Sequence, residues 1–384
     1  MRLTYAPLWR QLSQRGMNKE DLRTETGLST ATIAKLGKGQ NVQSDVLLRI
    51  CESLNCGIND IVECIPRGAR GKKEKGVTDS THRVVDLFCG CGGMSLGFEQ
   101  AGLNVVAGFE NWGPAITVYE DNFDHPVISQ DLSQVADSVA LISKFEPDII
   151  IGGPPCQDFS TAGAQDETRG RAELSIRFAE IVKAIMPEYF VMENVANIRA
   201  SKSFQKVLDI FRNAGYGLTH EVLNAALCGV PQTRRRMFVI GQRNGIDGFL
   251  TDRLRNSLAE KPMTIRDYLG DSLGIEHYFR VPTNYSRRGV FSIDEPSMTI
   301  RAVDRPIPKG YKGNPKDSAP VSEVRGLTPK ERSRIQTFPE EFVFAGSKGN
   351  VNSMIGNAVP VKLAEYVASN LLDFMKEDSR VCSE

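Results

Sequence analysis

The sequence lacks the features that mark membrane, secreted or metal-binding proteins. No apolar run approaches the ~18 residues of a membrane span, and the opening Met-Arg-Leu-Thr-Tyr has no secretory apolar stretch. The 8 cysteines form no paired C-x-x-C knuckles, and no histidine pair stands near them, so we predict no metal site. We expect a cytoplasmic protein whose cysteines are reduced and, apart from Cys156, structural.

The chain also has no net charge, with 47 Lys and Arg against 47 Asp and Glu. The charge is unevenly distributed, however. Residues 1–75 hold 13 basic and 8 acidic side chains, a net of +5, and residues 270–336 hold 12 and 8, a net of +4. The remainder therefore sums to −9. Two basic segments on an acidic body suit a protein that meets DNA with particular faces.

Residues 1–66 are predicted to form a compact helical unit. Asn18 is a helix cap followed by early acidic residues, and Gly27 ends that helix. Ser29 caps a second helix over residues 30–36, and a third helix is predicted over 44–54. A helix, a turn that contains glycine and a second helix have the spacing of a helix-turn-helix.

The side chains of this unit divide into buried and outward-facing sets. The predicted core is Leu22, Leu28, Ile33 and Leu36 in the helix pair, with Leu47, Leu48, Ile50 and Leu54 in the third helix. The outward set is Ser29, Thr30, Thr32 and Lys35. The unit resembles the Cro/repressor-type helix-turn-helix family, in which the second helix enters the major groove. The resemblance implies that the outward set contacts operator DNA. A dimerisation or packing module is the alternative.

A linker and the start of a different fold follow. Residues 67–82 are rich in glycine and basic residues and almost without apolar side chains, as in a flexible tether. From residue 83, strands and helices alternate: a strand over 84–88, a glycine turn over 90–93 and a helix over 95–101. That order is the nucleotide-binding opening of a doubly wound sheet, although a glycine turn can equally be structural.

Two acidic residues follow the next strands. Glu110 ends a strand over 105–109, twenty positions after Gly90, a spacing that suits a carboxylate accepting hydrogen bonds from ribose hydroxyls. Asp131 follows a strand near 126–129 and is placed to reach an adenine amino group.

The chain is organised around residues 148–160. The β-branched run 148–151 predicts a buried strand, and the Gly-Gly-Pro-Pro sequence 152–155 forbids both helix and further strand. Cys156 is thus predicted on a rigid loop at the carboxyl end of a strand, where its thiolate can be a nucleophile. A small buried side chain in a tight turn is the alternative. Glu193, at the end of a strand over 189–192, would lie at the same sheet edge, either in the site or in a structural pair with arginine.

Five motifs carry a family resemblance. They are Asp86-Leu87-Phe88-Cys89-Gly90-Cys91-Gly92-Gly93, Pro154-Pro155-Cys156-Gln157, Glu193-Asn194-Val195, Gln232-Thr233-Arg234-Arg235-Arg236 and Gly356-Asn357-Ala358-Val359-Pro360. Together they resemble the DNA cytosine-5 methyltransferases, over roughly residues 83–372. The resemblance implies an α/β fold with a doubly wound, mostly parallel, Rossmann-like sheet. A small irregular target-recognition domain and the all-α helix-turn-helix domain would complete the chain.

The resemblance also implies domains and partners. Residues 83–241 and 326–384 would form the catalytic domain and the basic, irregular stretch 242–325 the target-recognition region, although a plain surface insertion fits that stretch too. S-adenosylmethionine would be the cofactor and double-stranded DNA the substrate. The enzyme would belong to a restriction–modification system, and its N-terminal domain could regulate its own promoter or form a dimer.

Site residues follow from the same resemblance. The catalytic set is Cys156, Glu193, Arg234 and Arg236. The cofactor set is Asp86, Phe88, Gly90, Gly92, Gly93, Glu110, Asn111, Asp131, Pro154 and Asn357, with Asn357 expected at the start of the last helix, 361–374. Contacts to the methylated DNA would come from Gln157, Ser160, Arg287, Arg288 and Arg301.

The implied chemistry begins with Cys156 adding to C6 of a flipped cytosine, while Glu193 protonates or hydrogen-bonds N3. Arg234 or Arg236 would hold the cytosine carbonyl or a flanking phosphate. One rival is an enzyme acting on tRNA, since that branch shares the scaffold. A second is a transcriptional regulator with an inactive methyltransferase body, against which the intact motifs argue.

Overall fold

A computed structural model describes residues 2–15, 17–37, 41–65, 82–155, 173–282, 284 and 286–381. The chain forms two compact units, residues 1–73 and 74–384, and each is described by itself. Cys156, Gln157 and Ser160 lie outside the described residues. Among the helices that are described, none is both long and apolar enough to cross a membrane.

The smaller unit contains four helices and a pair of short strands within its described part. The helices are α1 (Ala6–Gln14), α2 (Lys19–Thr26), α3 (Thr30–Gly37) and α4 (Ser44–Leu54), followed by a short 3-10 helix, Ile58–Asp60. β1 (Arg2–Thr4) pairs antiparallel with β2 (Glu63–Ile65). The predicted α2, α3 and α4 are confirmed, whereas α1 and the two strands were not predicted, so the unit is not entirely helical.

Local capping explains why α2 and α3 begin where predicted. The Asn18 side chain accepts from the backbone N–H of Glu20 and Asp21 at 2.8 and 3.2 Å, and Asp21 Oδ2 accepts from the Asn18 N–H at 2.8 Å. Gly27 ends α2 with φ 64°, which a residue with a side chain adopts at a cost. Ser29 Oγ accepts from the Thr32 N–H at 3.1 Å.

The core of the smaller unit matches the prediction with one correction. Leu22, Leu28, Ile33, Leu36, Leu47, Ile50 and Leu54 are buried. Leu48, predicted to be in the core, is 58% exposed. One residue along a helix turns the side chain by about 100°, so Leu48 points away from the core that Leu47 faces.

The larger unit is built on a seven-stranded sheet in the order β5-β4-β3-β6-β7-β10-β8. The strands are β5 (Val127–Ser129), β4 (Asn104–Glu110), β3 (Arg83–Leu87), β6 (Ile149–Gly152), β7 (Tyr189–Val195), β10 (Arg235–Arg243) and β8 (Tyr216–Asn224). The first five are mutually parallel, and β10 runs antiparallel to both of its neighbours. The predicted doubly wound, mostly parallel sheet is confirmed.

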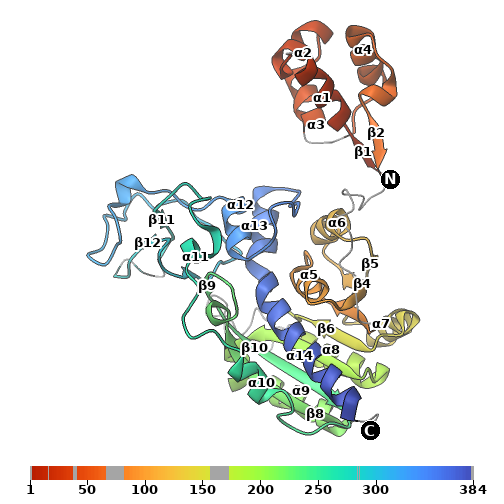
Figure 1. The fold of residues 1–384 in the computed structure, drawn as a ribbon, viewed down its shortest axis with the longest axis vertical. Helices are drawn as coiled ribbons and strands as arrows, with labels where there is room; N and C mark the ends of the chain where they lie inside the picture. The colour runs from red at the N-terminus through yellow and green to blue at the C-terminus, as the bar shows by residue number, and fades with distance from the viewer. Residues whose placement is uncertain are drawn as a thin grey trace. The chain divides into compact units, whose positions relative to one another are not determined.

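Helices cover both faces of this sheet (Figure 1). One face packs against α5 (Gly93–Gln100), α10 (Thr251–Asn256) and α14 (Val361–Val381). The other packs against α7 (Val135–Ile142), α8 (Glu173–Ile185) and α9 (Lys202–Asn213). Burial on both faces explains the uninterrupted apolar run of β6, in which residues 149–151 are 0% exposed. α6 (Gly113–Asn122) packs near β4 and β5.

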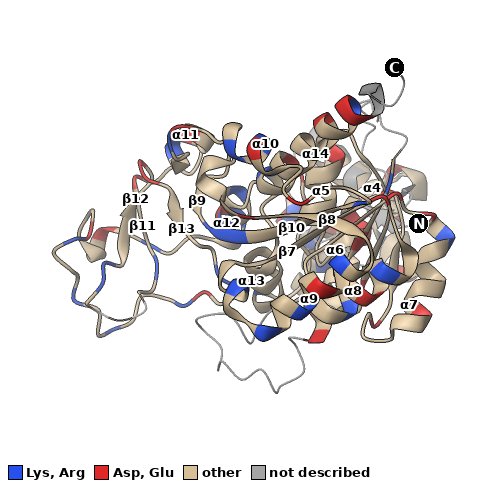
Figure 2. Ribbon diagram, turned by 90° about the horizontal axis from the view of Figure 1, so that it is seen from below, with Lys and Arg blue, Asp and Glu red and all other residues tan. Residues whose placement is uncertain are grey.

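The stretch predicted as the target-recognition region, residues 242–325, begins within the sheet and its helices, because β10 runs to Arg243 and α10 packs against the sheet. The described residues between 257 and 325 form an irregular lobe with short elements. They include α11 (Ile265–Leu269), β11 (His277–Phe279), β12 (Val290–Ser292), β13 (Ser297–Met298) and the 3-10 helix Val321–Glu323. β11 pairs with β12, and β13 pairs with β9 (Gln232–Thr233), which lies outside the lobe. Basic residues recur along the loops around β11 and β12 (Figure 2).

The C-terminal part contains a helix that was not predicted. α12 (Pro329–Ile335) is followed by α13 (Lys348–Asn357), and α14 begins at Val361. Asn357 therefore ends a helix, where we expected it to begin one, and it is exposed. The cause is Ser347, whose Oγ accepts from the Asn350 N–H at 3.2 Å and starts α13 nine residues earlier.

The described residues also form 3-10 turns at Ser143–Phe145, Ala196–Ala200 and Ala225–Leu227.

Candidate active site

The register of the sheet brings the predicted site to one edge. Leu87 of β3 pairs with Phe109 of β4 and with Gly152 of β6, and Gly152 pairs with Met192 of β7. The residues that follow these partners are Phe88, Glu110, Gly153 and Glu193, so they lie side by side at the carboxyl edge of the parallel strands. β3 and β6 flank the point where the strand order reverses, which is where doubly wound sheets bind ligands.

Glu110 connects the glycine turn with α6. Its Oε2 accepts from the Gly90 N–H at 2.9 Å, and its Oε1 accepts from the N–H groups of Asn111 and Trp112, both at 2.9 Å. The carboxylate thus orders the turn after β3. Its predicted contact with ribose hydroxyls stays a prediction, as do the contacts predicted for Asn111 and Asp131, which are exposed.

The glycines of the turn are required for different reasons. Gly92 has φ 90°, and a Cβ there would lie 2.2 Å from the Phe123 ring. A Cβ on Gly93 would lie 2.3 Å from the carbonyl oxygen of Val359. Both glycines are therefore demanded by packing. Gly90, with φ 55°, has nothing within 4 Å of its Cβ position, so a ligand can approach the backbone there.

Asp86 is the buried carboxyl group beneath this turn. Its Oδ2 accepts from Ser95 Oγ at 2.6 Å, while its Oδ1 has no hydrogen-bond partner among the described residues. Burial is the main reason why the pKa of Asp86 is raised to about 7. An unpartnered buried acceptor beside open backbone fits a ligand that brings a cationic donor, as the ammonium of S-adenosylmethionine does.

Glu193 lies at the root of the loop that leads to Cys156. It is 8% exposed, and its Oε1 accepts from Arg236 Nε at 2.8 Å. Burial raises the pKa of Glu193, and the nearby Arg236 and Arg234 guanidinium groups lower it by a smaller amount. A Cβ built on Gly153 would lie 3.4 Å from Glu193 Oε2. The carboxyl group thus borders the Gly-Pro-Pro backbone directly.

Asn194 contacts the predicted site, although the sequence reasoning did not single it out. Its Nδ2 donates to the Pro154 carbonyl oxygen at 3.3 Å and to Ser175 Oγ at 3.4 Å. It thus connects Pro154, two residues before Cys156, to β7 and α8. Its place beside Glu193 in the motif was the available signal.

The two alternating arginines have different surroundings. Arg234 is 1% exposed, and its guanidinium donates to the carbonyl oxygens of Ile300, Gly356 and Ala358, each at 3.0 Å. Its Nε–H has no hydrogen-bond partner among the described residues. The predicted contact of Arg234 with the cytosine or a flanking phosphate therefore stays a prediction, although three carbonyls already hold its terminal nitrogens. Arg236 alone faces Glu193 by direct contact.

The predicted DNA contacts are also unequal. The Arg288 guanidinium donates to both carboxylate oxygens of Glu295 and lies 4.4 Å from the Phe291 ring centroid. The predicted contact of Arg288 with DNA stays a prediction, and it would compete with this ion pair. Arg287 and Arg301 are exposed. In the smaller unit Ser29, Thr30 and Lys35 are exposed and Thr32 is half-buried.

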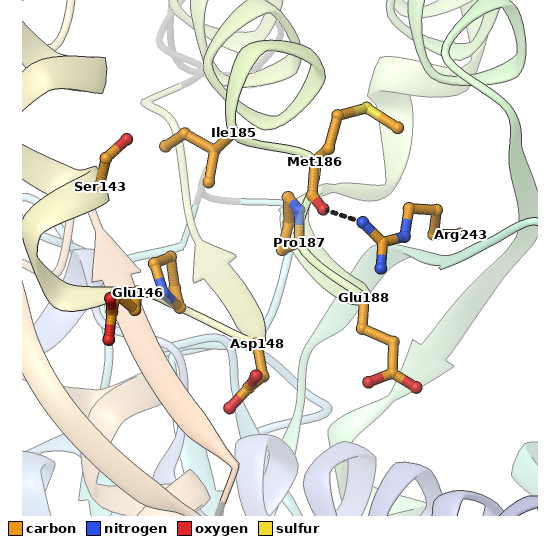
Figure 3. Close-up of a pocket in the computed structure, with 9 residues that line it drawn as sticks. Ser143, Glu146, Asp148, Ile185, Met186, Pro187, Glu188 and Arg243 are labelled. Atoms are coloured by element: carbon orange, nitrogen blue, oxygen red, sulfur yellow. Dashed lines mark hydrogen bonds between the residues drawn. The ribbon is translucent and has the colours of Figure 1, made fainter.

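A surface pocket of about 360 Å³ lies elsewhere (Figure 3). Residues 146–148 precede β6, residues 185–188 precede β7, and Arg243 ends antiparallel β10, so the pocket is at the amino edge of the sheet. Arg243 there donates to the Met186 carbonyl at 2.9 Å. The pocket is thus separate from the predicted site residues.

Within the described ranges no group of three or more His, Cys, Asp or Glu could hold a metal ion.

Comparisons with known proteins cover both units. The C-5 cytosine-specific DNA methylase family matches residues 82–373, and the Cro/C1-type HTH DNA-binding domain matches residues 7–67. The type II methyltransferase M.HindV of Haemophilus influenzae is 54% identical over 300 residues, which are 78% of this chain and 99% of that protein. The type II methyltransferase M.HgiDI of Herpetosiphon aurantiacus is 52% identical over 295 residues, 77% of this chain and 96% of that one.

The fold has solved counterparts. The S. pombe Dnmt2 methyltransferase aligns with a TM-score of 0.59 at 20% identity, covering 76% of this chain and 98% of that one. At this identity the likeness concerns the fold alone.

Proposed function

The chain belongs to the C-5 cytosine-specific DNA methylases, and from this membership we propose a mechanism in which Cys156 attacks a flipped cytosine covalently. The observation that carries the proposal is the buried Glu193–Arg236 pair, which borders the Gly-Pro-Pro backbone three residues before Cys156. A proton donor beside a nucleophile loop is what addition to cytosine requires.

Cytosine C5 is a poor nucleophile until C6 is attacked. The Cys156 thiolate forms a bond to C6, and the electron pair of the C5–C6 double bond becomes available at C5. Negative charge developing on the ring is relieved at N3 by a proton or hydrogen bond from Glu193. After methyl transfer, loss of the C5 proton and departure of Cys156 restore the double bond and release 5-methylcytosine.

Burial suits Glu193 to this task. A raised pKa keeps more of the carboxyl protonated near neutral pH than an ordinary glutamate. Arg236, held against it, is placed to bind the cytosine carbonyl. The base must leave the helix first, at a cost of roughly a few kcal/mol that contacts in the pocket offset.

S-adenosylmethionine, when bound, supplies an electrophilic methyl group on a sulfonium. The groups that would hold it are the open backbone at Gly90, the unpartnered Asp86 Oδ1 and the Glu110 carboxylate, with Phe88 beside them as the resemblance implies. Asp86 and Glu110 place negative charge near a cationic ligand, so the electrostatics of the site agree with its charge.

The relatives described as type II methyltransferases support a role as the modification enzyme of a restriction–modification system. The Cro/C1-type domain supports a second DNA contact, with an operator in the enzyme's own promoter. Its exposed α3 residues Ser29, Thr30 and Lys35 would face the major groove.

Methyl transfer is tested with the full chain. Bisulfite sequencing of DNA from expressing cells should show 5-methylcytosine at one recurrent sequence. Cys156→Ala should abolish transfer and spare DNA and cofactor binding, whereas Cys56→Ala, a half-buried cysteine of the other unit, should leave the rate unchanged. Turnover by Cys156→Ala would end the covalent mechanism. Methyl incorporation into tRNA in place of DNA would favour the RNA branch.

The operator is tested separately. Deleting residues 1–75 should spare methylation and remove preferential binding to a fragment of the gene's promoter. Equal binding of that fragment and unrelated DNA by the full chain at physiological salt would reject the regulatory role.

A further inference from the structure

Three consecutive backbone carbonyls, those of residues 299–301 (the clamped segment), each accept a hydrogen bond from an arginine of a different element. Arg280, just after β11, donates to the first at 3.2 Å, and Arg234, just before β10, donates to the second at 3.0 Å. Arg332 of α12 donates to the third. Charge-assisted hydrogen bonds of this kind are strong, so the backbone of the clamped segment is held in place.

Further contacts hold the same segment from β9, which pairs with β13, and from α13. The Ile300 N–H donates to Gln232 Oε1 at 2.9 Å, and Thr299 Oγ1 donates to the Thr233 carbonyl at 2.8 Å. A Cβ on Gly356 would lie 2.1 Å from the Ala302 nitrogen, so α13 packs tightly against the end of the segment. The one long polar side chain of the clamped segment, that of Arg301, is therefore presented on a fixed backbone.

The charges around this segment are not balanced. Arg332 is 4% exposed, Arg280 is half-buried, and Arg301 is exposed. In the described part of the chain, the only carboxylate that forms an ion pair with any of the three is Asp304, 4.0 Å from Arg332. The pKa of Arg280 is lowered to about 10, mainly by burial and also by the nearby charges of Arg301 and Arg332. Among the described residues, therefore, only Arg332 of these three cations has a carboxylate within 4.0 Å.

The Arg301 guanidinium itself makes no side-chain hydrogen bond or ion pair among the described residues. It differs in this respect from Arg288 and Arg266 of the same lobe, which are ion-paired with carboxylates. A free planar guanidinium on a rigid backbone, with two cations behind it, matches an anion with two oxygens in one plane.

We propose that Arg280, Arg301 and Arg332 form a binding site for a backbone phosphodiester of the DNA strand, with Arg301 making the direct contact. The site rests on the proposed function for its ligand and its position. Arg234 connects the clamped segment to the edge that carries Glu193 and Arg236, because its charge acts on both. The phosphate is therefore one close to the target cytosine, and the buried Arg280 and Arg332 strengthen the local positive potential.

The salt dependence of DNA binding tests the charge. The probe is a duplex that holds the methylated sequence, with the full chain as wild type and Arg301→Gln. Losing one phosphate contact should lower the slope of log affinity against log salt by about 0.9, so wild type should lose about 3.5-fold more affinity than the variant between about 50 and 200 mM KCl. Arg301→Lys keeps the charge and should keep the slope.

A matched control separates a local contact from net charge. Arg325 lies beside β11 and is paired with both carboxylate oxygens of Glu331 at 2.8 and 2.6 Å. Arg325→Gln makes the same change in net charge and should leave the slope unaltered. Equal slopes for wild type and Arg301→Gln, or an equal fall in both Gln variants, would overturn the site.

The identity of the anion is tested with methylphosphonate duplexes, in which one phosphate at a time is neutral. Neutralising one position should weaken binding by wild type and have no effect on binding by Arg301→Gln. Additive losses at every position would overturn the assignment while leaving the enzyme's activity standing. If inorganic phosphate competes for the site but no neutralised duplex position weakens binding, the site binds free phosphate. That result would also overturn the assignment to a DNA phosphodiester.

Discussion

Replacing Arg234 by methionine separates a structural from a catalytic arginine. The substitution keeps an unbranched side chain but leaves the buried carbonyl oxygens of Ile300 and Gly356 without their donor, whereas the Ala358 carbonyl keeps a bond from Gln336 Nε2 at 3.2 Å. An unsatisfied buried polar group costs about 1–3 kcal/mol, so the gross loss for two carbonyls is about 2–6 kcal/mol.

An opposing effect reduces that figure. Burial lowers the pKa of Arg234, and the charge of Arg236 lowers it further, so removing the cation relieves some desolvation and repulsion. Because three carbonyls already solvate the guanidinium, the relief is the smaller of the two effects. We expect a net loss of about 3 kcal/mol in the free energy of unfolding, or a fall of roughly 5 °C in Tm.

The assay is urea and thermal unfolding of the full chain, followed by circular dichroism, with methyl transfer measured in parallel. Arg235 is exposed, so Arg235→Met is the matched control and should shift the unfolding free energy by no more than about 0.5 kcal/mol. An Arg234→Met protein that unfolds like wild type but does not turn over would refute the reasoning, since the guanidinium would then act on the base.

Three further outcomes are expected. Glu193→Gln should lower turnover by about 10²–10⁴-fold and leave duplex affinity unchanged. Because burial raises the pKa of Glu193, the wild-type rate should fall as the pH rises through this raised pKa. A fall of the same shape in the variant would contradict the assignment. The pKa of Asp86 is raised to about 7, so ionisation of this carboxyl group opposes folding. Without cofactor, the free energy of unfolding should decline by roughly a few kcal/mol between about pH 4 and 7. Urea titrations of Asp86→Asn should not show this decline. Leu47→Ala should cost about 2–4 kcal/mol and Leu48→Ala under about 0.5 kcal/mol; equal thermal shifts would show that α4 is oriented differently.

Elements that depend on neighbouring residues were predictable. The caps at Asn18 and Ser29 and the stop at Gly27 are short-range interactions, and they define α2 and α3 as expected. The β-branched run of β6 and the alternation of strands and helices gave the sheet, because a parallel sheet buried on both faces needs such runs. The position of Glu193 at a strand end placed it at the site edge for the same reason.

Features that depend on distant partners were not predictable from the sequence. Whether Arg234 faces a base or three carbonyls is decided by residues 66 to 124 positions away. The pairing of Arg288 with Glu295, and the burial of Gly356 against residues 301–302, belong to the irregular lobe, which has no periodic pattern to read.

By itself, then, the sequence determined the strands, the caps, the glycine and proline punctuation and the chemical motifs, because these arise from local backbone preferences and hydrophobic periodicity. Only the tertiary structure decided which charged side chains are free and which are already bound. A guanidinium binds whichever carbonyl or carboxylate the fold brings to it, and for Arg234 those carbonyls belong to residues 66 to 124 positions away.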